Sequence, residues 1–376
     1  MSIQKNDSDI LCDRIFLKKQ VSENFIETIN MRYKAAIDVM NINVENLKVI
    51  YCNSINKHTC LLEKNKTLYL VFDEHHSNML GALNILYYTY GNIDFKQVFY
   101  ELVLKLNDYF KNRLSSTILI LLTEKNIINN KLSKAHLLAS IIKEYEFSLD
   151  NTDEEDSFFL NLYLIKSRKT FDMQIFSLNF YVFHELSHVK YKQDKSVFRK
   201  ISKVLKNNIS TNMQIFEKLN TNKYTTFYAE EECICDIYAL IKLLEFTSKN
   251  AGDSFLFEIV ESYITSTLNI VLMGSIYESS IHKYEDTFVS AYLRIITVVN
   301  TFLELLLENN SNFSFKKVQN HMNYTREKFA NFKSIFDEQV LYFEELCKTN
   351  KTEYAFQTEE WKHAFNEAIE ILSLLN

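Results

Sequence analysis

The sequence contains no proline and only four glycines among its 376 residues. Proline and glycine are the residues that most often interrupt helices and strands and form sharp turns. Their scarcity predicts a mostly helical protein with few tight turns. Hydrophobic residues make up 47% of the chain, which is enough for a sizeable core in one large domain or two modest ones.

Several other features are also missing. The six cysteines form no CxxC pair, and no signal peptide stands at the start, so we expect reduced thiols in a cytoplasmic protein. No apolar run reaches about 18 residues, which predicts no membrane span. The formal charge of −6 and the scattered lysines give no basic footprint of a nucleic-acid-binding protein. Phosphate-binding glycine loops and nucleophile elbows are absent as well.

The pattern of hydrophobic residues predicts the fold. Three short segments rich in β-branched and aromatic residues, at 47–52, 59–62 and 67–72, predict strands, and the last two predict a hairpin. Residues 1–45 are predicted to be helical. From about residue 77 the periodicity is helical, which predicts helices near 94–110, 131–145, 172–192, 195–219, 224–249, 253–278, 286–308, 314–348 and 354–375. The predicted class is mainly α with a small N-terminal β-hairpin or sheet.

One predicted helix carries three titratable residues inside an apolar run, YVFHELSHVK at 181–190. His184 and His188 are four residues apart, which places both imidazoles on one face of a helix. Glu185 stands beside the first histidine. Burying such groups is costly unless they are paired or bind a metal. The HExxH pattern on a helix is typical of zinc-dependent hydrolases, in which the glutamate is the general base.

A catalytic zinc site needs a third protein ligand and an open position for water. A predicted helix at 227–246 offers Glu232, and Asp236 one turn later can accept the second N–H of a ligand histidine. Asp194 is an alternative, because it stands where HExxHxxGxxD motifs have their third ligand. Tyr191, however, replaces the glycine that turns the chain back in those motifs.

Other acidic and sulfur-containing clusters have simpler interpretations. Glu230 and Glu231 fit the start of a helix, where carboxylates favour the helix dipole, although Glu231 stays a candidate ligand. The segment FDEHHS at 72–77 is interpreted in the same way. Cys233 and Cys235 are two residues apart on a helix and point in different directions, so a disulfide between them is not expected.

The combination of HELSH with Glu232-x-x-x-Asp236, 44 residues after His188, resembles the gluzincin pattern of thermolysin-type metallopeptidases. The longer pattern E-x-x-C-D-x-x-A at 232–239 is also similar to cytoplasmic bacterial peptidases, including phage-exclusion peptidases of the Lit type. The resemblance implies Zn²⁺ bound by His184, His188 and Glu232. It implies Glu185 as the catalytic base and Asp236 as the partner of a ligand histidine.

The resemblance also implies an activity and an organisation. The expected activity is that of a zinc metalloendopeptidase acting on a protein or peptide substrate, with no nucleic-acid or membrane partner. Many zincins hold an extended substrate along an edge strand, and TLYLVF at 67–72 is our candidate. We expect an N-terminal α/β region at 1–115, a helical zincin-like metal-binding core at 116–310 and a C-terminal helical region at 311–376.

Two residues beyond the motif have open roles. Some related peptidases carry a His-Pro pair shortly before an arginine, but Phe288 and Val289 stand before Arg294 here. An arginine that lies on the surface or pairs two helices is therefore at least as good an interpretation of Arg294. His282 is either an oxyanion donor or an ordinary histidine.

The alternative function is not enzymatic. The chain would then be a helical interaction protein with a structural or vestigial metal site. A structural site is closed by a fourth protein ligand, for which Cys233, Cys235 and Asp194 are the candidates.

Overall fold

The computed structural model describes residues 16–17, 22–54, 60–64, 66–89, 168–217, 230–251, 255–278, 285–308 and 314–350. The described elements are β1 (Phe16–Leu17), α2 (Glu23–Met40), β2 (Leu47–Ser54), β3 (Cys60–Lys64), β4 (Thr67–Asp73), α3 (Glu74–Thr89), α7 (Arg168–Gln193), the 3₁₀ helix η2 (Lys195–Phe198), α8 (Arg199–Glu217), α9 (Glu230–Ala251), α10 (Leu256–Glu278), α11 (Glu285–Glu308) and α12 (Phe315–Asn350). The predicted class, mainly α with a small N-terminal sheet, is confirmed.

The sheet has the strand order β1-β2-β4-β3. The predicted hairpin is present, since β3 and β4 pair antiparallel, whereas β2 and β4 are parallel. The turn of the hairpin uses Lys66 at φ 65°, a conformation that glycine would adopt more easily. One prediction was wrong: TLYLVF forms β4, which lies inside the sheet with a neighbour on each side. β4 pairs with β2 on one side and with β3 on the other. β3 is therefore the edge strand on that side of the sheet.

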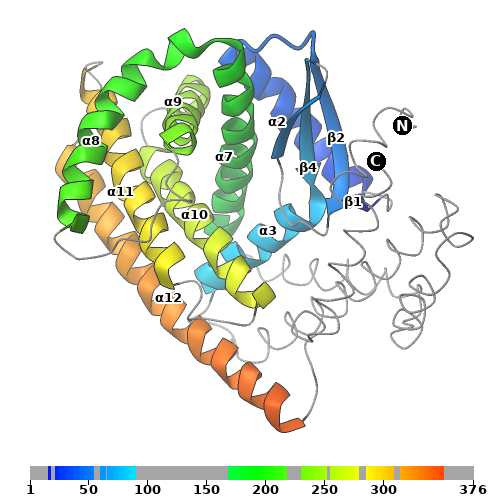
Figure 1. The fold of residues 1–376 in the computed structure, drawn as a ribbon, viewed down its shortest axis with the longest axis vertical. Coiled ribbons are helices and arrows are strands. Elements are labelled where there is room, and N and C mark those ends of the chain that lie inside the picture. Colours follow the sequence, from blue (N-terminus) through cyan, green and yellow to red (C-terminus); the bar gives the residue numbers. More distant parts are fainter. Residues whose placement is uncertain are drawn as a thin grey trace, which may run out of the picture.

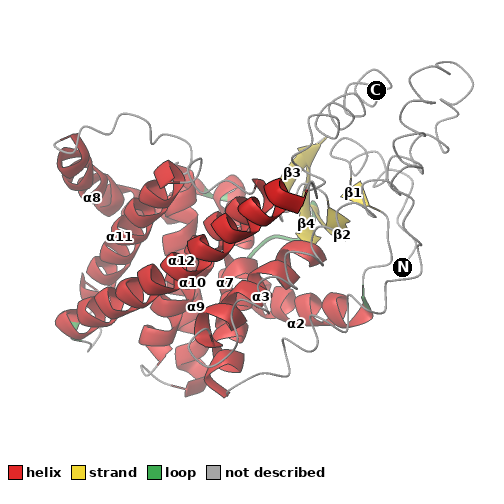
Figure 2. Ribbon diagram, turned by 90° about the horizontal axis from the view of Figure 1, so that it is seen from below, coloured by secondary structure: helices red, strands yellow, loops and turns green. Residues whose placement is uncertain are grey.

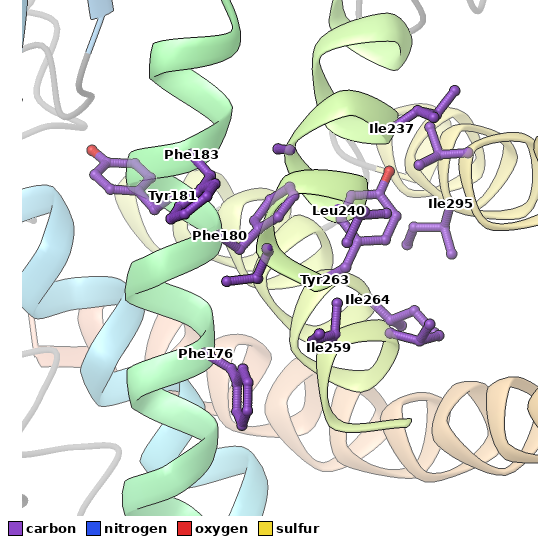
Figure 3. Packing of buried hydrophobic residues seen from close by; sticks show 14 of the residues in the cluster. Phe176, Phe180, Tyr181, Phe183, Ile237, Leu240, Ile259, Tyr263, Ile264 and Ile295 are labelled. Carbon is purple, nitrogen blue, oxygen red and sulfur yellow. The ribbon is translucent and has the colours of Figure 1, made fainter. Parts of the chain in front are cut away.

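Helix α7 is at the centre of the structure, between α2 and the sheet on one side and α8 and α9 on the other (Figure 1). Its 26 residues include neither proline nor glycine, so nothing in its sequence interrupts the helix. It is buried on two opposite sides (Figure 3). Phe180 contacts Tyr263 of α10 with ring centroids 5.1 Å apart, while the hydroxyl of Tyr181 lies 2.6 Å from Nδ1 of His76 in α3.

The C-terminal end of α7 is tied to the loop that joins α2 to the sheet. Asn41 ends α2 in the left-handed conformation, and its carbonyl oxygen accepts a hydrogen bond of 2.8 Å from Nζ of Lys190. Gln193 and Asn43 exchange two bonds, of 3.1 and 2.6 Å, between the Gln193 side chain and the Asn43 backbone. These contacts hold the loop that precedes β2 against the last turn of α7.

Helices α10, α11 and α12 complete the core, and α12 runs across the other helices (Figure 2). In α11 the segment Ser290–Glu308 is long and apolar enough to cross a membrane, with 19 residues and a mean hydropathy of 1.4. However, 72% of it is buried inside the protein. Buried residues such as Val298 and Phe302 belong to the same core as those of α7. A mostly buried core helix passes the same test of length and hydropathy, so this result is weak evidence for a membrane span.

Some predictions lie outside the described residues. These are the helices near 94–110, 131–145 and 354–375, and both predicted boundaries, at 115 and 310. The division into three regions therefore stays a prediction. Within the described part, the prediction of helix throughout 1–45 was wrong at β1, a two-residue strand that pairs with β2.

The packing around α7 can be tested with Phe183→Ala. Phe183 is 1% exposed, and truncation of a buried phenylalanine leaves a cavity, so we expect the free energy of unfolding to fall by about 3–5 kcal/mol. Chemical denaturation followed by circular dichroism measures this. Tyr324→Ala is the control, because Tyr324 is 57% exposed and should lose less than about 1 kcal/mol. Equal losses in the two variants would contradict the assigned core.

Candidate metal centre

Helices α7 and α9 bring three potential ligands together. Nε2 of His184 lies 3.3 Å from Nε2 of His188, and these two nitrogens lie 3.5 and 3.4 Å from the two carboxylate oxygens of Glu232. A tetrahedral zinc ion with bonds of about 2.0–2.1 Å separates its ligand atoms by about 3.3–3.4 Å. Each of the three distances is therefore close to such an edge, and the two that involve Glu232 end at different oxygens of its carboxylate.

The sequence explains why these side chains meet. His184 and His188 lie one turn apart on α7, and Glu232 is the third residue of α9. Ala239, two turns further along α9, is fully buried, and its small side chain permits close approach of the helices. In the described part of the chain, this is the one group of three or more histidine, cysteine, aspartate or glutamate residues whose ligand atoms lie within 4.8 Å of one another.

The site has a buried side and an open side. The histidine side chains are 13% exposed, whereas the side chain of Glu232 is 36% exposed. Solvent therefore reaches the cluster at the N-terminal end of α9. Three protein ligands with access from one side is the arrangement of catalytic rather than structural zinc sites.

Asp236 fixes the orientation of His184. Its Oδ1 atom lies 2.7 Å from Nδ1 of His184, so Nε2 of the same ring is directed toward His188 and Glu232. The other oxygen of Asp236 accepts hydrogen bonds of 2.9 Å from the hydroxyl of Tyr263 and 2.6 Å from Nε of Arg294. A carboxylate placed beside the second nitrogen of a ligand histidine favours one orientation of the ring and raises its basicity.

The structure gives Arg294 a place in the site: the interpretation as a surface arginine was wrong, whereas that of an arginine pairing two helices is confirmed, because Arg294 of α11 contacts two carboxylates of α9. Its residue is 8% exposed, and its Nη2 atom donates to Oε2 of Glu232 at 3.1 Å. The guanidinium thus contacts both Glu232 and Asp236. Its neighbours Leu293 and Ile295 are buried, so the apolar sequence around Arg294 was the available signal that it faces the core.

The charges in this cluster shift one another's pKa values. Burial opposes protonation of His184, but Asp236 and Glu232 outweigh burial and raise the pKa of His184 to about 10. Burial also opposes ionisation of Glu232, but contacts with His184 and Arg294 outweigh it and hold the pKa of Glu232 well below its usual value. The cluster therefore favours an ionised carboxylate, which is the form that binds a metal.

Glu185 lies on the same helix and is 9% exposed. Burial raises the pKa of its carboxyl group, although His184 and His188 act in the opposite direction. A carboxylate with a raised pKa is a stronger base than an exposed glutamate. The electrostatic influence of Glu232 on this pKa is consistent with a position close to the ligand cluster.

His188 has partners on its second nitrogen too. Its Nδ1 atom lies 3.3 Å from Oε1 of Glu231 and 3.4 Å from Sγ of Cys235. Both residues therefore face the ring nitrogen that points away from the ligand cluster. Burial raises the pKa of the Cys235 thiol well above its usual value, so this residue contacts His188 as a neutral thiol.

The other candidates from the sequence lie elsewhere. Asp194 is exposed and accepts a hydrogen bond of 3.0 Å from the backbone N–H of Ser196. It thereby caps the start of η2. Asp73 accepts one of 3.1 Å from the backbone N–H of His76 at the start of α3, as predicted for FDEHHS. His282 lies outside the described residues.

Comparisons with models of protein families, with curated proteins and with solved structures found no match to this chain.

We expect purified protein to bind one zinc ion, and His184→Ala and Glu232→Ala to lose it, because each removes one of three ligands. Elemental analysis after dialysis against zinc measures this. Asp194→Ala is the matched control and should keep the metal. Retention of zinc by Glu232→Ala would contradict the assigned third ligand and direct attention to Glu231.

The network around Asp236 can be tested in metal-free protein. Arg294→Gln should lower the free energy of unfolding by about 3–5 kcal/mol, because it leaves a buried carboxylate without its cationic partner. Asp236→Asn combined with Arg294→Gln should cost less than the sum of the two single changes. Denaturation in the presence of EDTA measures all three variants, and strict additivity would show that the two side chains do not interact.

Proposed function

We propose that the protein is a zinc metallopeptidase with His184, His188 and Glu232 as ligands and Glu185 as the general base. The spacing of the three ligand groups, 3.3–3.5 Å between neighbouring atoms, is the observation that carries the proposal. Two imidazole nitrogens that face each other and one carboxylate at these distances suit a zinc ion that keeps one position for water or substrate.

The protein side chains supply distinct parts of the chemistry. A zinc ion bound here would polarise the scissile carbonyl and lower the pKa of a water molecule. The carboxylate of Glu185 would accept a proton from that water and donate it to the departing amine nitrogen. Asp236 would hold His184 in the orientation required for binding, and Arg294 would fix the carboxylates of Asp236 and Glu232 relative to each other.

An extended substrate would need a strand edge near the centre, as the resemblance to zincins implies. Among the described strands, β3 is an edge strand that contacts α7, the helix that carries both histidines. Glu63 of β3 forms an ion pair of 2.8 Å with Lys192 at the end of α7. This pair keeps the edge strand beside the helix that carries both histidines.

A structural metal site is the second candidate, and the donor set argues against it. A closed site requires a fourth protein ligand. Cys235 faces Nδ1 of His188, on the far side of the ring from the ligand cluster, and Asp194 caps η2. Neither residue is directed toward the corner that a fourth ligand would occupy.

Glu185→Gln tests the assigned base. The amide is close in size but cannot accept a proton, so we expect zinc content to stay the same and peptide hydrolysis to fall at least about a hundredfold. Hydrolysis of a quenched-fluorescence peptide library by zinc-loaded protein measures the rate, with elemental analysis on the same sample. Unchanged hydrolysis in this variant would reject Glu185 as the base. A fully zinc-loaded wild-type protein that cleaves no member of the library would favour the structural site.

A further inference from the structure

A strip of positive charge begins two residues after the second ligand histidine. Between 190 and 206 the sequence has seven basic residues and one acidic residue, within a chain whose formal charge is −6. The basic residues, here called the basic strip, are Lys190, Lys192, Lys195, Arg199, Lys200, Lys203 and Lys206. All except Lys190 are exposed. The lysines are therefore clustered here, whereas the sequence as a whole had been interpreted as having scattered lysines.

Helix α8 directs its part of the strip outward. Ile201, Val204 and Leu205 are buried, and this side of α8 packs on α11 and α9. Arg199, Lys203 and Lys206 follow the i, i+4, i+7 pattern, so they share the opposite face. Because the apolar side of α8 between 199 and 210, where the side chains are described, is already used inside the protein, this part of the helix has no free apolar face to insert into a lipid bilayer.

Local acidic residues neutralise only part of the strip. Lys192, Lys200 and Lys206 form ion pairs with glutamates of other elements, at 2.8, 2.9 and 3.7 Å. The side chains of Arg199 and Lys203 form no ion pair with any described residue. The pKa of Asp194 is lowered mainly by its hydrogen bonds from Ser196, with smaller contributions from the charges of Lys190 and Arg199. Exposed pairs of this kind are weak, so the strip keeps a net positive charge.

The strip lies near both helices that form the metal centre, α7 and α9. Lys190 follows His188 on α7, and Nζ of Lys206 lies 3.7 Å from Glu230, two residues before the ligand Glu232. Figure 1 shows α8 beside α9 on the side away from the sheet. A polypeptide that extends from the open side of the centre can therefore reach α8.

We propose that the basic strip is a secondary binding site for an acidic stretch of the substrate polypeptide, next to the bond that is cut. One turn of helix separates successive cations of α8 by about 5–6 Å, close to the spacing of about 6.6 Å between alternate side chains of an extended peptide. The acidic chain as a whole repels long polyanions, which favours a short acidic segment over a nucleic acid.

This inference rests on the proposed peptidase function, but binding can be measured without catalysis. The probe is a fluorescein-labelled peptide of twelve residues that alternates glutamate and serine, titrated with full-length protein in EDTA. Neither zinc nor hydrolysis contributes under these conditions. We expect fluorescence anisotropy to show binding that weakens between 50 and 300 mM salt, and no binding of the lysine–serine peptide.

Charge reversal locates the binding surface. Arg199→Glu combined with Lys203→Glu should weaken binding of the acidic peptide at least about tenfold, since each change replaces attraction by repulsion. Arg199→Gln with Lys203→Gln should give a smaller loss. The matched control, Lys316→Glu with Lys317→Glu, reverses two exposed lysines at the start of α12 and should leave binding unchanged.

Several results would overturn the proposal. These are equal binding of the acidic and basic peptides, an equal loss in the α12 control, or tighter binding of a single-stranded RNA 12-mer or of vesicles with 30% phosphatidylserine. If the acidic peptide fails to bind while zinc-loaded protein still cleaves the library, only this inference fails. If binding holds and hydrolysis is absent, the strip stands and the peptidase proposal fails.

Discussion

The contact between His184 and Asp236 constrains the rest of the structure more than any other. Asp236 is 1% exposed, and a carboxylate in that position is costly unless it is fully paired. Its partners come from three further helices, with His184 on α7, Tyr263 on α10 and Arg294 on α11. These four helices must pack so that all of them reach one side chain, and Glu232, one turn before Asp236, is then placed beside both imidazoles.

The same network has a consequence for the metal-free protein. Although burial opposes it, the carboxylates of Asp236 and Glu232 favour a proton on His184 and raise its pKa to about 10. Metal binding must displace that proton, so affinity for zinc and proton concentration are linked. Packing and these charges hold the ligand groups close together.

Local patterns in the sequence were sufficient for the parts of the structure that depend on helix or strand periodicity. The i, i+4 spacing of His184 and His188 and the single turn between Glu232 and Asp236 predicted which groups share a face, and the structure brings the two pairs together. The hairpin of β3 and β4 was predicted from short β-branched segments. In each case the signal lies within a few residues of the feature.

Features that depend on distant partners could not be predicted in this way. Strand composition does not specify neighbours, so the position of β4 inside the sheet was missed. Arg294 lies 58 residues from Asp236, and no spacing rule joins them. The basic strip was hidden by the overall charge, because net charge does not show which face of a helix carries it. Tertiary packing supplied the missing information in the first two cases, whereas the basic strip lies within residues 190–206 and was missed because acidic residues elsewhere outweigh it in the overall charge.

The loop between α2 and β2 gives the structure one further property. Lys190 and Gln193 bind the backbone of Asn41 and Asn43, and the same end of α7 carries Lys192, which pairs with β3. These contacts join the sheet to the metal-binding helix at the end nearest His188. Any shift of the edge strand relative to the imidazoles would have to break them, so a chain lying along that edge would be presented to the two histidines by the same polar contacts that join the helix to the sheet.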